Sequence, residues 1–174
     1  MEPGRPAWLE DPLLHETIPA SEIRRLENQF SNRRPDQLAT TRSSWELQVR
    51  NLAKMRAAGA RVVLGSDSAG DPSRTMGWHA IWELDALAKA GMKPSEVIVA
   101  STRLAAETLK LDQLGTIAPG KSADFVVLDA NPLDDIANTE KRAGVMVRGR
   151  WLPEAELKKM LDEIAPRFQK ALGN

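Results

Sequence analysis

Apolar residues recur every three to four positions along most of the first 110 residues, a spacing that predicts amphipathic helices. Helices are predicted over residues 21–30, 36–58, 77–90, 94–100 and 102–110. Ser21 suits the cap of the first helix, and Pro35 suits the opening of the second because its fixed φ fits a first helical turn. Trp45 and Trp82 fall on apolar helix faces, so we expect both to pack in the core.

One short apolar run interrupts this helical pattern. Val62, Val63 and Leu64 lie between Arg61 and Gly65, and such a run predicts a strand over residues 61–66 that is buried on both faces. Helices are predicted on both sides of this strand. The order helix, strand, helix is the unit that parallel α/β folds repeat.

The pattern changes after Leu111, where short β segments with short connections predict a small second module. Strands are predicted over residues 124–129, 144–147 and 151–152. Pro153 then opens a terminal amphipathic helix, which Pro166 interrupts. The expected division of the chain is residues 1–110, 111–152 and 153–174.

Composition narrows the class of protein. The 174 residues allow one domain, or one domain with an appendage, and 42% hydrophobic residues argue against general disorder. Equal numbers of basic and acidic residues, 24 of each, argue against a nucleic-acid partner. No secretory signal and no apolar run long enough for a membrane are present, so the expectation is a cytoplasmic chain. The absence of cysteine excludes disulfides and a thiol nucleophile, and two histidines leave little for a histidine-rich metal site.

Asp67 is the main candidate for chemistry, because it directly follows the predicted strand. Catalytic groups of barrel enzymes lie at the carboxyl ends of strands, where an aspartate can bind a metal or act as a general base. Aspartates after strands also commonly cap turns, and spacing alone leaves both interpretations open. His79, near the start of a predicted helix, either faces the same site or is simply solvated.

Three further polar features have simpler interpretations. Residues 115–122 match the phosphate-loop pattern, but a phosphate loop needs a strand before it and a helix after it, and here the order is reversed. His15 is expected at the surface, and Asp134 and Asp135 are expected to cap or solvate a turn. Trp78 is placed where it could line the opening beside Asp67.

Several segments together resemble one family, the metal-dependent amidohydrolase superfamily, and within it the imidazolonepropionase-like and prolidase-like branch. The segments that carry the resemblance are residues 58–68, 82–97, 100–109 and 114–133. The resemblance implies an α/β fold: the C-terminal part of a (β/α)8 barrel, with residues 61–66 as its last strand and helices over 77–110. It also implies that residues 111–152 form part of a flanking β-sandwich, followed by a terminal helix.

The resemblance also implies a site. Asp67 would bind one divalent metal, usually zinc, and carry a proton from the bridging water to the leaving group. Ser68, Ala69 and Gly70 would lie on the loop that shapes the substrate pocket, with His79 nearby. The family's other ligands are a His-x-His pair, a carboxylated lysine or glutamate, and two further histidines. They have no counterpart in this sequence.

Two functions follow from the resemblance. The first is a hydrolase of carbon–nitrogen bonds in small amides, cyclic amides or dipeptides, using metal-activated water. Because zinc takes about four ligands, we expect this chain alone to hold no complete metal site and to show negligible hydrolysis. The alternative is a non-catalytic subunit that completes a barrel with another polypeptide or self-associates, since an unpaired strand favours association. Neither function calls for a nucleic acid or a membrane.

Overall fold

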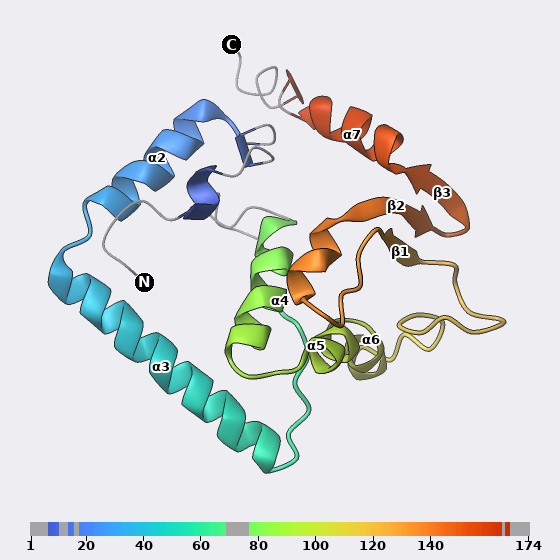
Figure 1. The fold of residues 1–174 in the computed structure, drawn as a ribbon, viewed down its shortest axis with the longest axis horizontal. Coiled ribbons are helices and arrows are strands. Elements are labelled where there is room, and N and C mark those ends of the chain that lie inside the picture. Colours follow the sequence, from blue (N-terminus) through green and yellow to red (C-terminus); the bar gives the residue numbers. More distant parts are fainter. Residues whose placement is uncertain (1–6, 11–13, 16–17, 69–76, 165, 168–174) are drawn as a thin grey trace.

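The computed structural model describes residues 7–10, 14–15, 18–68, 77–164 and 166–167 (Figure 1). These residues are mostly helical, with one small antiparallel sheet near the C-terminal end. In chain order the elements are η1 (Ala7–Glu10), α2 (Ala20–Ser31), α3 (Pro35–Ala57), α4 (Trp78–Lys89), α5 (Pro94–Ser101), α6 (Arg103–Thr108), β1 (Phe125–Leu128), η2 (Ile136–Glu140), β2 (Arg142–Val147), β3 (Arg150–Pro153) and α7 (Glu154–Asp162). None of these helices combines the length and apolar character needed to cross a membrane.

The sheet confirms the predicted change of pattern after Leu111. Its strands lie in the order β1-β2-β3, and both pairs are antiparallel, with Val126 opposite Val145 and Val145 opposite Leu152. The β2–β3 turn occurs at Arg148 and Gly149, which both have positive φ, as two-residue hairpin turns require. Helix α7 packs against β2 and β3. The short connection predicted by the sequence is found between β2 and β3, whereas residues 129–141, which include η2, connect β1 to β2.

Two apolar clusters form the core. One joins the N-terminal segments to the start of α4, and its buried members are Leu9, Leu14, Ile18, Ile23, Leu26 and Trp78. The other joins α4, α5 and η2, and its buried members are Leu87, Met92, Val97, Ala100 and Ile136. Helix α4 contributes to both clusters. Helix α4 therefore links the N-terminal segments with α5 and η2.

The helix boundaries depend on proline and glycine, largely as predicted. Pro35 opens α3, while Gly59 and Gly91 have φ of +83° and +90° just after α3 and α4. The predicted Ser21 cap is wrong, because α2 begins at Ala20 with Pro19 as its N-cap residue and no side-chain cap. Glycine ends a helix by entering the left-handed region at little steric cost, which is a local property of the chain.

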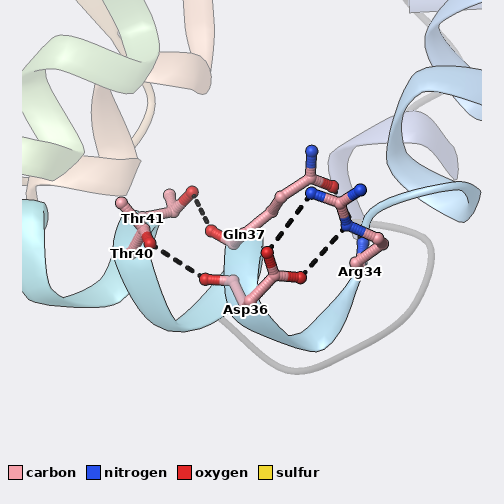
Figure 2. A network of polar contacts seen from close by, with 5 residues as sticks. All are labelled: Arg34, Asp36, Gln37, Thr40 and Thr41. Atoms are coloured by element: carbon pink, nitrogen blue, oxygen red, sulfur yellow. Dashed lines mark hydrogen bonds and ion pairs between the residues drawn. The ribbon is translucent and has the colours of Figure 1, made fainter.

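The long helix α3 contacts the core through partly buried residues such as Leu52, and its Arg56 pairs with Glu96 of α5 at 2.6 Å. At its start, the Arg34 N–H donates to Gln37 Oε1 at 2.9 Å, and the Arg34 guanidinium pairs with Asp36 (Figure 2). No residue of α3 is buried, and Figure 1 shows the helix along one edge of the molecule. The expectation that Trp45 packs in the core is wrong, because its side chain is 38% exposed. An apolar stripe is buried only where another element covers it.

The predicted strand over residues 61–66 is not formed. Residues 60–68 have no regular secondary structure, although the Leu64 N–H donates to Ala100 O at 3.3 Å. A strand of a parallel sheet exists through hydrogen bonds to neighbouring strands. The strands in the described part of the chain are β1, β2 and β3, and they pair only with one another. The apolar run is therefore extended chain without a ladder.

Candidate functional site

The segment that carries Asp67 is anchored to the helices on one side. Val62 packs against the core cluster of α4 and α5, and Leu64 is hydrogen-bonded to the carbonyl of Ala100 in α5. The Arg61 guanidinium pairs with Glu107 of α6 at 2.6 Å. These contacts fix the path of the chain up to Gly65. Asp67 therefore follows an anchored segment, although that segment is not a strand.

Asp67 itself is exposed, whereas its neighbours Ser66 and Ser68 are half-buried. Its backbone is left-handed, with φ of +48°. Across it, the Ser66 hydroxyl donates a hydrogen bond to Ser68 Oγ at 3.0 Å. The predicted pocket residues Ala69 and Gly70 lie outside the described residues. Asp67 is therefore the exposed middle residue of a bent tripeptide.

His79 lies in the first turn of α4 and is half-buried. Its ring centroid is 4.9 Å from that of Trp82, at an interplanar angle of 57°. The Trp82 ring is in turn 6.0 Å from that of Trp78. Trp78 does not line an opening as expected: it is only 7% exposed, and its indole N–H is buried without a hydrogen-bond partner. The aromatic side chains near His79 are therefore mainly part of the core.

Glu83 is a polar residue of this helix that the sequence analysis overlooks. Burial raises its pKa above the usual value for a glutamate, while the charge of His79 acts in the opposite direction. The spacing of four residues between His79 and Glu83 is the signal that could have identified the pair. A half-buried carboxylate with a perturbed pKa beside an imidazole is a recognisable functional candidate.

The described residues do not fit the metal that the resemblance implies. They contain no group of three or more histidine, cysteine, aspartate or glutamate side chains that could hold a metal ion. Zinc takes about four ligands. Asp67 could serve as a ligand only together with side chains from elsewhere. The described residues therefore offer Asp67 as a single potential ligand and no coordination shell around it.

The remaining polar features agree with their simpler interpretations. Asp135 caps η2, because its carboxylate accepts a hydrogen bond from the Ala137 N–H at 2.9 Å. His15 is exposed, with Nε2 donating to the carbonyl of Leu9 at 2.6 Å. The loop over residues 115–122 leads into β1 rather than into a helix. It therefore lacks the helix N-terminus that a phosphate loop uses to bind an anion.

The chain is similar to known amidohydrolases in both sequence and structure. The sequence model of the amidohydrolase family matches residues 8–152. A crystallised amidohydrolase is 33% identical with a TM-score of 0.53, and the match covers 60% of this chain and 25% of that chain. Phenylurea hydrolase B is 31% identical with a TM-score of 0.53, and the match covers 64% of this chain and 27% of that chain. A candidate prolidase from Bifidobacterium longum is 27% identical with a TM-score of 0.59, and the match covers 87% of this chain and 37% of that chain.

The chain thus spans between 25% and 37% of the length of these three crystallised proteins. No protein with a curated description matches it significantly.

Proposed function

Since the chain belongs to the amidohydrolase family, we propose that it supplies one part of a hydrolase of carbon–nitrogen bonds, with Asp67 as its reacting carboxylate. The substrates would be small amides, cyclic amides or dipeptides. The observation that carries the proposal is the placement of Asp67, exposed at the end of a segment anchored to α5. Asp67 would also be one ligand of the divalent metal, and the other catalytic groups and metal ligands would come from residues outside the described part of the chain.

The chemistry proposed for Asp67 is proton transfer. Its carboxylate would take a proton from the water that attacks the carbonyl carbon, and would return that proton to the leaving nitrogen as the carbon–nitrogen bond breaks. The carboxylate ends the cycle unchanged. An exposed position suits this role, because the group must reach both the water and the leaving nitrogen.

The proposal extends to the fold. Residues 61–66 would form the last strand of a (β/α)8 barrel once neighbouring strands lie beside them, with α4 to α6 following on the outside. The small sheet of β1, β2 and β3 would then be part of the flanking sandwich. The chain would hold the strand end that bears Asp67, and the rest of the barrel would supply the facing groups.

A reconstitution experiment tests this function. The chain alone is expected to bind no stoichiometric zinc and to hydrolyse no dipeptide. Mixed with the part of the Bifidobacterium longum protein that it does not match, it is expected to support zinc-dependent hydrolysis. Asp67→Asn should then lower kcat by about a thousandfold, since an amide cannot transfer the proton.

Asp112→Asn is the matched control, because Asp112 is an exposed carboxyl in the turn after α6. Hydrolysis that survives Asp67→Asn, or turnover with stoichiometric zinc from the chain alone, would contradict the proposal.

A second function, non-catalytic association, is favoured by α3. None of its residues is buried, and its side chains Leu47 and Met55 are 50% and 56% exposed. Covering them with a second copy or a barrel partner would remove apolar surface from water. Light scattering should show association that is reduced by Leu47→Lys with Met55→Lys. The control variant Gln48→Lys adds a charge at an exposed polar position and should leave association intact. A wild-type chain that is monomeric would argue against this function.

A further inference from the structure

Asp67 has a left-handed backbone conformation that is uncommon for a residue other than glycine. Lys110 and Arg148 are the other non-glycine residues with positive φ in the described part of the chain. Lys110 follows the end of α6, and Arg148 lies in the β2–β3 turn, where left-handed residues are normal. Asp67 instead follows residues 60–66, which have no regular secondary structure, so no helix end or hairpin among the described residues before it accounts for its conformation. A non-glycine residue held in this region marks a local constraint.

The hydroxyl groups on either side of Asp67 supply such a constraint. In an extended chain, residues two apart are separated by about 6.6 Å, because each residue advances the chain by about 3.3 Å. When two serines are that far apart along an extended backbone, their hydroxyl oxygens do not come within hydrogen-bond distance of each other. Ser66 Oγ and Ser68 Oγ are nevertheless 3.0 Å apart, because the left-handed residue between them bends the chain. The hydrogen bond and the bend therefore depend on each other.

We propose that Ser66 and Ser68 are positioning residues whose mutual hydrogen bond helps to hold the Asp67 backbone left-handed, and so helps to set where its carboxylate lies. The inference rests on the proposed function of Asp67 and names the residues that orient it. Both serines are half-buried, so their bond is partly shielded from competing water, while Asp67 remains exposed. Neither serine is required to touch the substrate for this role.

Nuclear magnetic resonance of the full chain tests the inference without any enzymatic assay. A left-handed residue brings its amide and α hydrogens close together, so the wild-type chain should show a strong NOE between these two hydrogens of Asp67. Ser66→Ala and Ser68→Ala should each weaken this NOE to the level of an extended residue such as Val63. Ser66→Thr keeps a hydroxyl and should keep the NOE. A strong NOE in both alanine variants, with folding verified by circular dichroism, would overturn the inference.

The hydrolysis assay adds a separate readout. In the reconstituted enzyme, Ser66→Ala should lower kcat about tenfold with KM unchanged, because the carboxylate is misplaced rather than lost. Ser66→Thr should restore kcat. If the NOE changes while Asp67→Asn leaves hydrolysis intact, the proposed function fails and the hydroxyl constraint stands. If Asp67→Asn abolishes hydrolysis while the alanine variants keep kcat and the NOE, the inference about the serines fails alone.

Discussion

At the scale of single residues, Gly115 is fixed by both its backbone and its surroundings. Its φ is +83°, and an added Cβ would lie 2.7 Å from the Ala106 Cβ and 2.9 Å from the Thr102 carbonyl oxygen. Gly115→Ala is therefore expected to reduce the free energy of unfolding by about 2–4 kcal/mol, through backbone strain and overpacking.

Gly120 provides the matched control, because it has the same φ and no atom within 4 Å of an added Cβ. Gly120→Ala should cost only about 1–2 kcal/mol, the strain alone. Urea unfolding of the two variants measures the difference. Equal losses would show that the contact with α6 has no energetic consequence.

Glu83 connects the burial of one side chain to the pH dependence of stability. Burial raises its pKa in the folded chain above the usual value of about 4.3, despite the opposing charge of His79. A group with a raised folded-state pKa gives its full stabilisation below the unfolded pKa and loses it as pH rises through the folded pKa. Glu83→Gln should therefore stabilise the chain by less than about 1 kcal/mol at about pH 7, since partial exposure screens the effect.

The same variant should match the wild type at about pH 3.5, where the glutamate is protonated. Thermal unfolding at the two pH values measures both differences, with Asp112→Asn as the comparison at an exposed carboxyl. A Glu83→Gln variant that is less stable than the wild type near neutral pH would contradict this prediction.

At the scale of elements, α3 and α5 should differ sharply in local stability. Helix α3 has 23 residues and none is buried, whereas Val97 and Ala100 of α5 are completely buried. Amide hydrogens become exchangeable through local opening where few apolar contacts resist it. Hydrogen exchange should therefore be much faster along α3 than along α5. Equal protection of the two helices would mean that α3 is covered in solution, as the association function requires.

At the scale of the whole molecule, the described fold lacks the neighbours that residues 61–66 need. Apart from Leu64, whose N–H donates to Ala100 O, their amides should exchange rapidly in the chain alone and become protected in the reconstituted enzyme. Barrel closure would supply hydrogen bonds on both sides. The amides of β2, which are paired on both sides already, serve as the internal control. Hydrogen exchange by mass spectrometry measures both. Unchanged exchange at residues 61–66 in an active mixture would exclude a strand there.

Local features of the fold could be predicted because they depend on short stretches of sequence. Pro35 opens α3, Gly59 and Gly91 follow helix ends, and Arg148 with Gly149 turns the hairpin. Each is a property of backbone conformation that a few adjacent residues determine. Family membership was identifiable for the same reason, since it rests on contiguous motifs. Asp67 was singled out by the motif that contains it.

Exposure and environment were decided only by the tertiary structure. Trp45 and Trp78 both carry large apolar rings, yet one is 38% exposed and the other 7%, because the N-terminal segments pack against Trp78 and no core cluster in the described part of the chain includes Trp45. The run over 61–66 has the composition of a strand but finds no neighbour to pair with, and the raised pKa of Glu83 follows from burial. The sequence determined the elements and the family, whereas burial, strand pairing and pKa depend on which distant residues meet.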